Sequence, residues 1–341
     1  AIMSTWEEQA GYPRVHAEWS DGKIHLEQSR VGGGDEIYSI PLTFATKMTP
    51  DFEETTPAMW MNSKTAEIEG INPTDWIIFN IKQSGYWQVS YSEGLWKLIL
   101  EALKTEHDII DKFNRAELFT SMQNSLLDGE IQAFYGLELM SYLEEDRRRF
   151  VWERVEVVDK IFRKFLPRDD TYVQYQKLVD KITEPHLANL GLAEYEGETV
   201  AETNFRNSLK DLSCGNLLPN CLNFEYKRLI SFIETGKGDY DLCQAMRLAD
   251  PEVHNYFVDK MFNEKNFEML FDLTCSLNRD ILMRFYKRVW DKISTGYLRL
   301  MLTWSTEQSP VAMNATLDFI KENYDEINKR FGCCMSFLNV Y

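Results

Sequence analysis

The sequence predicts a multidomain β + α chain: a small antiparallel β-sandwich followed by an α-helical solenoid. In residues 12–91, short runs of alternating apolar and polar residues are separated by turn signals every 8 to 12 residues, as in a sandwich. After Ser92, apolar residues recur at i, i+3, i+4 and i+7, the spacing of amphipathic helices. We therefore expect a β-sandwich domain over 1–91 and an α-helical solenoid domain over 92–341.

The first strands of the sandwich are the most clearly marked. The dipeptide Asp21-Gly22, which accommodates the positive φ angles of a two-residue hairpin turn, separates the runs 13–20 and 23–30. Apolar and polar residues alternate along both arms, so one face of the hairpin is expected to be buried. Residues 37–47 are expected to form a third strand.

Glycines and prolines punctuate the helical part at the length of helix pairs. These residues are Gly129, Pro167, Pro185, Gly197, Pro219, Gly236 and Pro251. A pair of antiparallel helices buries its apolar face only against its neighbours, so stacked pairs predict an α–α superhelix of the HEAT/ARM type. No sequence repeat of fixed period is present; the solenoid is inferred from the apolar pattern.

The segment 76–99, WIIFNIKQSGYWQVSYSEGLWKLI, changes from strand to helix periodicity. It is expected to be the last hairpin of the sandwich running directly into the first helix. We expect Trp87 and Trp96 to pack this hairpin against that helix and to fix the angle between the two parts.

Composition excludes several classes of function. The net charge of −17 and the lack of a basic stripe argue against binding nucleic acid. No apolar run reaches the length of a membrane span, and the first residues carry charges where a signal peptide is apolar. Both ends read as cut, which predicts a piece of a larger protein.

The cysteines leave two interpretations open from their spacing alone. The six are Cys214, Cys221, Cys243, Cys275, Cys333 and Cys334. They are either scattered buried thiols of a cytosolic protein, or they include local bridges Cys214–Cys221 and Cys243–Cys275 of a secreted domain. The triplet Asn314-Ala315-Thr316 makes Asn314 a candidate glycosylation site and favours secretion slightly.

Motifs for chemistry are missing from the sequence. It contains no HExxH, no phosphate-binding loop and no GxSxG elbow, so we predict no catalytic, cofactor-binding or metal-binding residue within the chain. The cluster Asp146 to Phe150, DRRRF, is a candidate anion site. The favoured interpretation is an exposed helical face in which these arginines form salt bridges with Glu144, Glu145 and Asp146.

Several longer motifs resemble one family, the zinc aminopeptidases of the aminopeptidase N type. The sandwich resembles theirs in MSTWEEQAGYP (3–13), in IPLTFAT (40–46) and in the closing hairpin, through Trp76, Asn80, Gly85, Tyr86, Val89 and Tyr91. The helical part is similar through FNRAEL (113–118) and through Leu137, Tyr142, Leu143, Glu145 and Trp152. The resemblance covers nearly the whole chain.

The resemblance implies a non-catalytic C-terminal fragment of a hydrolase. In this family a zinc-binding catalytic domain lies upstream, and the helical domain, truncated here at its C-terminus, caps and shapes the active-site cleft. The family's bridges imply the pairs Cys214–Cys221 and Cys243–Cys275. Cys333 and Cys334 have no partner in that scheme and are expected to be buried free thiols.

Three functions follow as alternatives. The first is the cap of a cell-surface zinc metallo-aminopeptidase, the parent acting on peptides and anchored at the extracellular face of the plasma membrane. The second is a docking module, such as a receptor for a bacterial toxin or a virus. The third is an independent helical scaffold with a glycan-binding sandwich. The resemblance also implies a possible homodimer and leans towards the insect midgut type, which carries a GPI-anchor.

Overall fold

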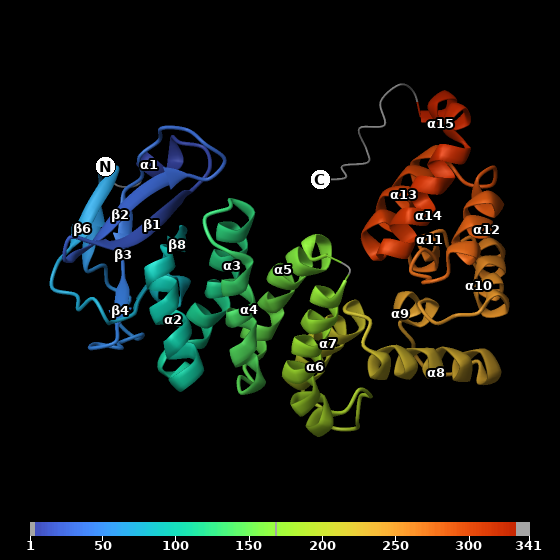
Figure 1. Cartoon of the computed structure of the whole chain (residues 1–341), viewed down its shortest axis with the longest axis horizontal. Coiled ribbons are helices and arrows are strands. Elements are labelled where there is room, and N and C mark those ends of the chain that lie inside the picture. Colours follow the sequence, from blue (N-terminus) through green and yellow to red (C-terminus); the bar gives the residue numbers. More distant parts are fainter. Residues whose placement is uncertain (1–3, 168, 332–341) are drawn as a thin grey trace. The chain divides into compact units, whose positions relative to one another are not determined.

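The computed structural model describes residues 4–167 and 169–331. A β part is followed by helices only, as the sequence predicts (Figure 1). Contacts divide the chain between Leu212 and Ser213 into two compact units. Unit 1 contains all the described strands and the helices up to most of α7, and unit 2 contains the helices from α8 on. The division that the sequence predicts at residue 91 stays a prediction.

The β part contains three small sheets. The largest sheet has the strand order β6-β2-β1-β8, and the pairs β3-β5 and β4-β7 form two separate sheets. The bounds are α1 Ser4–Glu7, β1 Pro13–Ser20, β2 Lys23–Arg30, β3 Ile40–Leu42, β4 Phe44–Thr46, β5 Met59–Met61, β6 Thr65–Ile68, β7 Ile77–Phe79 and β8 Gln88–Tyr91.

The predicted first hairpin is confirmed in its bounds and register. Ser20 pairs with Lys23 across Asp21-Gly22, whose φ angles are 50° and 82°. Inward positions alternate along both strands, and the side chains of Val15 and Ile24 are fully buried. The turn dipeptide and the period-two pattern therefore set this register together.

Two features of the sheets differ from the prediction. The expected single strand over 37–47 is split at Thr43, because β3 pairs with β5 whereas β4 pairs with β7. The sandwich is also not wholly antiparallel, since β8 runs parallel to β1, with Val15 opposite Val89. Parallel neighbours need a crossover, and here almost the whole sandwich separates β1 from β8 along the chain.

The segment predicted as a closing hairpin is not a hairpin, because β7 pairs with β4 and β8 pairs with β1; a buried turn connects the two strands. Asn80 has a left-handed backbone conformation with φ 55°, and its amide donates to the carbonyls of Gly85 and Trp87 at 2.9 Å each. Its Oδ1 accepts from the Gly85 N–H at 2.9 Å. A Cβ at position 85 would lie 2.2 Å from the Trp87 indole nitrogen. Each residue of this motif is therefore required for a different reason. Asn80 forms the hydrogen bonds that hold the turn, and Gly85 leaves room for the Trp87 side chain.

One short helix of unit 1, η1, lies between β7 and β8, and the longer helices begin directly after β8. Their bounds are η1 Ile81–Gln83, α2 Glu93–Glu106, η2 His107–Ile109, α3 Lys112–Leu127, α4 Ala133–Ser141, η3 Tyr142–Glu144, α5 Arg149–Phe165, α6 Asp170–Leu190 and α7 Val200–Gly215. α6 continues through Pro185, where the sequence indicates a break. Its neighbours Ile182, Thr183 and His186 are buried, and their packing offsets the backbone hydrogen bond that the proline removes.

The turn between β7 and β8 and helix α3 share a junction of hydrogen bonds and aromatic packing. Asn114 of α3 accepts from the Lys82 N–H at 2.9 Å and donates to the Asn80 carbonyl at 3.0 Å. Trp87 and Trp96 are 4% and 0% exposed, as expected for residues that pack this segment against the helix. The sequence did not predict the hydrogen bonds of Asn114 in this junction, because they depend on which backbone groups of the turn have no partner within the turn itself.

Unit 2 is helical throughout its described residues. Its helices are α8 Pro219–Thr235, α9 Leu242–Met246, α10 Pro251–Glu264, α11 Met269–Leu273, α12 Arg279–Val289, α13 Thr295–Gln308, α14 Pro310–Glu322 and α15 Tyr324–Phe331. Pro219 and Pro251 occupy first helical positions, and Gly236 ends α8 with a positive φ, as typical helix signals. One continuous apolar core joins these helices, with Phe257, Tyr286 and Phe319 fully buried or nearly so.

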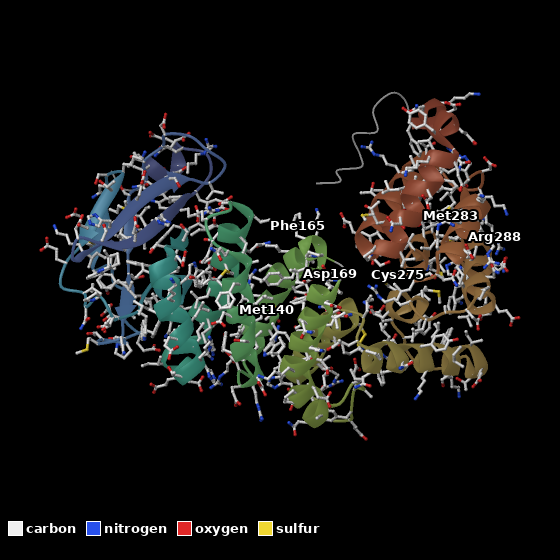
Figure 2. All side chains as sticks on the ribbon, in the orientation of Figure 1. Met140, Phe165, Asp169, Cys275, Met283 and Arg288 are labelled. Atoms are coloured by element: carbon white, nitrogen blue, oxygen red, sulfur yellow. A yellow bond between two sulfur atoms is a disulfide. The ribbon has the colours of Figure 1, made fainter. Side chains whose placement is uncertain are left out.

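Both cysteine pairs implied by the family resemblance are confirmed as disulfides. Cys214 is bonded to Cys221 at the start of α8, and Cys243 in α9 is bonded to Cys275 just after α11 (Figure 2). Both lie in unit 2, which therefore has two covalent closures besides its core. Cys333 and Cys334 lie outside the described residues.

We expect the double variant Cys243→Ala/Cys275→Ala to be less stable by about 3.7 kcal/mol, because its bridge closes the longer loop. Cys214→Ala/Cys221→Ala should lose about 2.5 kcal/mol. Urea unfolding, followed by hydrogen exchange of the α10–α12 amides, measures both. An equal loss for the two variants would contradict loop closure as the source of the stabilisation.

Candidate functional site

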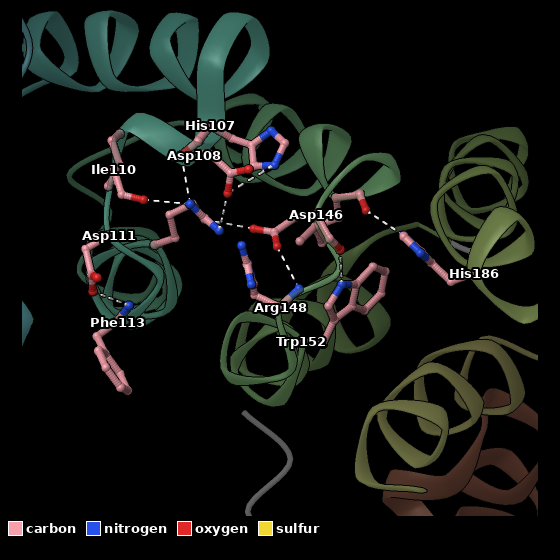
Figure 3. A network of polar contacts seen from close by, with 11 residues as sticks. His107, Asp108, Ile110, Asp111, Phe113, Asp146, Arg148, Trp152 and His186 are labelled. Carbon is pink, nitrogen blue, oxygen red and sulfur yellow. Dashed lines mark hydrogen bonds and ion pairs between the residues drawn. The ribbon is translucent and has the colours of Figure 1, made fainter. Parts of the chain in front are cut away.

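The most concentrated polar network in the described residues lies inside unit 1, between α3 and the turn that precedes α5 (Figure 3). Its centre is an ion pair between Arg115 and Asp146, whose side chains are 2% and 0% exposed. Arg115 Nε donates to Asp146 Oδ2 at 2.8 Å. The two residues are 31 positions apart, so folding alone brings them together.

Arg115 is surrounded by acceptors. Its Nη1 donates to the carbonyls of His107 and Ile110 at 2.9 and 2.6 Å, and its Nη2 lies 3.2 Å from Asp108 Oδ1. A buried guanidinium is tolerated when its donors find partners in this way, since each unpartnered donor would add a desolvation cost. Arg115 therefore fastens the turn between α2 and α3 as well as Asp146.

Asp146 holds the opposite side of the network. Its Oδ1 accepts from the Arg148 N–H at 2.8 Å, and its own carbonyl accepts from the indole of Trp152 at 2.6 Å. These bonds set the path of residues 146–148 into α5.

Burial, with the Asp146 carboxylate as a secondary cause, raises the pKa of the neighbouring Tyr142 hydroxyl well above its usual value.

This arrangement corrects the expectation for the DRRRF cluster. Residues 146–148 precede α5 and are not helical, and Asp146 is fully buried; an exposed helical face was expected. Two residues of the expected local pairs have other partners: Arg149 bonds Glu153, and Glu144 bonds Lys181. The local charge pattern could not identify Arg115 as the true partner, although Arg115 belongs to the FNRAEL motif that carried the resemblance.

Two buried histidines tie helices to carbonyls in the same manner, one in each unit. His186 Nε2 lies 2.9 Å from the Leu143 carbonyl in unit 1, and the ring packs against Trp152. His254 Nε2 lies 3.0 Å from the Leu273 carbonyl in unit 2, against Phe285. Because a carbonyl only accepts, both rings carry the proton on Nε2. They are structural donors.

Burial raises the pKa of two carboxyl groups, one in each unit. In unit 1, desolvation raises the pKa of Glu117 to about 7, against a smaller opposing effect of Arg154. In unit 2, desolvation raises the pKa of Asp272 to about 6, and Asp241 and Glu268 add to it.

The described residues contain no group of three or more His, Cys, Asp or Glu side chains arranged to hold a metal ion. In the same residues no helix has the length and apolarity needed to cross a bilayer. Asn314 is exposed in α14, whereas the hydroxyl of Thr316 bonds the Tyr286 hydroxyl in the core. Glycosylation of Asn314 stays a prediction.

We expect Asp146→Asn to destabilise unit 1 by about 3–5 kcal/mol, because it leaves the Arg115 charge buried without its counter-ion. The control Glu144→Gln removes an exposed pair with Lys181 from the neighbouring turn and should cost less than about 1 kcal/mol. Hydrogen exchange of α3 and α5 measures both. Similar hydrogen-exchange protection in the two variants would show that the buried Arg115–Asp146 pair stabilises unit 1 no more than the Glu144–Lys181 pair does.

We expect the contribution of His254 to the stability of unit 2 to fall as the pH drops from 6.5 towards 4, while Asp272, whose raised pKa favours protonation in the folded chain, acts in the opposite direction below pH 6. Burial lowers the pKa of His254 from 6.5 to about 4, so in that window the unfolded chain binds a proton that the folded chain excludes. The loss attributable to His254 approaches about 3 kcal/mol at the lower end.

The pH dependence of urea unfolding for the wild type and His254→Gln measures this effect. The variant should be less stable than the wild type at pH 7, and this difference should shrink as the pH falls from 6.5 to 4, because only the wild type loses the His254 contribution. Parallel profiles would rule out His254 as the titrating group.

Comparison with known proteins agrees with the resemblance. Residues 76–340 match the family model described as the ERAP1-like C-terminal domain. An aminopeptidase N of Plutella xylostella is 23% identical over 96% of this chain and 37% of its own length. A membrane alanyl aminopeptidase of Manduca sexta is 26% identical over 85% of this chain and 31% of its own.

A mammalian relative gives a similar result. Endoplasmic reticulum aminopeptidase 1 of Rattus norvegicus is 23% identical over 97% of this chain and 37% of its own length. The chain therefore spans about a third of the length of the curated relatives it matches.

Proposed function

The chain belongs to the ERAP1-like C-terminal domain family, as the C-terminal region of an aminopeptidase N family protein, and from this we propose that it caps an active-site cleft. In this proposal the longer protein removes N-terminal residues from peptides. The region described here shapes the cleft and limits access to it. The proposal includes the division into a sandwich over 1–91 and a cap over 92–341.

The observation that carries the proposal is the junction at Asn114. A cap can position a substrate only if it is held at a defined angle to its support. Asn114 joins the first turn of α3 to the turn between β7 and β8 through both the oxygen and the nitrogen of its side-chain amide. One residue later, Arg115 joins α3 to the entry of α5. This chain of bonds supports a stiff pedestal for the helices.

We infer that zinc and the catalytic side chains belong to the remainder of the longer protein. We also place the protein at the extracellular face of the plasma membrane, held by an anchor such as GPI. Two disulfides support an oxidising compartment, because such bonds are rare in the cytosol. The names of two relatives, membrane alanyl aminopeptidase and thyrotropin-releasing hormone-degrading ectoenzyme, support the same placement.

The second candidate function is a docking surface for a bacterial toxin or a virus. No contact among the described residues favours it over the cap. Homodimerisation likewise stays a proposal. Binding of a candidate toxin to the purified chain, measured by calorimetry, is the test of docking.

The test of the cap compares long and short substrates in the full-length enzyme. We expect Asn114→Ala to lower kcat/KM about tenfold for a ten-residue peptide, since the cap is misplaced. A single-residue aminoacyl reporter, which does not reach the cap, should change less than about twofold. The control Asn189→Ala removes an exposed amide that bonds only its own helix.

Two outcomes would contradict the proposal. The first is an equal loss on both substrates, or no loss on either, for Asn114→Ala. The second is zinc-dependent turnover of the reporter by residues 1–341 alone, which would place the catalytic residues inside this chain.

A further inference from the structure

A basic and aromatic patch, exposed at Arg147, Arg148 and Phe150 and half-buried elsewhere, stands out on this acidic chain. It consists of Lys112, Phe113, Arg147, Arg148, Arg149 and Phe150, called here the RRR patch. The two phenyl rings are in contact with centroids 5.0 Å apart, and the Lys112 ammonium lies 5.2 and 5.7 Å from them. The Arg149 guanidinium lies 5.8 Å from the Phe150 ring, which is 41% exposed.

The patch is built on the buried network described above. Asp146 is fixed by Arg115, and its Oδ1 accepts from the Arg148 N–H, so the backbone that carries Arg147 and Arg148 is held in place. Figure 3 shows the Phe113 ring directed away from the Arg115–Asp146 pair. The exposed cations therefore stand on a rigid support, which lowers the entropy lost on binding.

The charges of the patch are poorly neutralised within the described part of the chain. Arg147 and Arg148 are exposed and form no ion pair there, and Lys112 contacts only the two rings. Arg149 bonds Glu153. The carboxylates beside these four cations are those of Glu145, Glu153 and Asp111, and Asp111 is engaged in capping α3, so the patch stays positive although the chain as a whole carries −17.

We propose that the RRR patch binds an acidic segment of a partner protein that carries an apolar or aromatic side chain beside its carboxylates. Guanidinium groups bind carboxylates through two parallel hydrogen bonds, which a lysine cannot match. The paired phenyl rings supply apolar contact area for a neighbouring side chain. Because Arg147 and Arg148 are unpaired, no existing ion pair has to break.

A short peptide fits better than an extended polyanion. Screening reduces charge interactions beyond about 8 Å at physiological ionic strength, so a segment confined to the patch experiences mainly its local positive charge. A long sulfated glycan or an anionic membrane extends over the surrounding acidic surface, where the net charge of −17 repels it.

The test uses residues 1–341 and a fluorescein-labelled hexapeptide of alternating Glu and Tyr, acetylated and amidated so that it has no free terminal carboxylate. Fluorescence anisotropy should show binding that weakens with salt. The same peptide with Gln in place of Glu should bind at least about tenfold more weakly. Arg147→Ala/Arg148→Ala should weaken binding of the acidic peptide about tenfold, and Phe150→Ala by a smaller factor.

The matched control is Lys177→Ala/Lys237→Ala, which removes two exposed positive charges elsewhere and should leave the affinity unchanged. Circular dichroism confirms that each variant is folded. Equal affinity of the Arg147→Ala/Arg148→Ala variant and the control would overturn the proposal. So would tighter binding of a heparin oligosaccharide or of phosphatidylserine vesicles than of the peptide, with the same dependence on Arg147 and Arg148.

Discussion

The buried ion pair between Arg115 and Asp146 is the constraint on which unit 1 depends most. Two charges removed from water need polar partners, and here two backbone carbonyls, a backbone amide and a second carboxylate supply most of them. The partners come from two segments, residues 107–110 before α3 and residues 146–148 before α5. The pair therefore holds the turn before α3 and the turn before α5 in one arrangement.

The residue before Arg115 extends that arrangement to the sandwich. Asn114 bonds the turn around Asn80, and Asn80 in turn bonds the backbone of Gly85 and Trp87 just before β8. Consecutive side chains of one helix thus face the sheet and the next helix. If the region caps a cleft, as we propose, this short path transmits the orientation of the sandwich to the helices without a flexible linker.

Unit 2 is held together by other means. Two disulfides, an extended apolar core and the His254 contact with the Leu273 carbonyl stabilise it. Its stability is therefore expected to respond to redox conditions and acid, whereas that of unit 1 depends on a charge pair. The RRR patch shows a further use of the network in unit 1, because the support that buries Asp146 also presents Arg147 and Arg148 to solvent.

The sequence by itself determined the fold class, the register of the first hairpin, several breaks between helices and, through the family resemblance, the two disulfides. These are properties of local periodicity, of turn and cap residues, or of long motifs, all of which act over a few positions. Only the tertiary structure decided the parallel pairing of β8 with β1, the exchange of partners at Thr43, the passage of α6 through Pro185 and the burial of Asp146. Each of these depends on a partner distant in sequence, and a local pattern contains no information on which distant group will satisfy a buried charge, strand edge or backbone carbonyl.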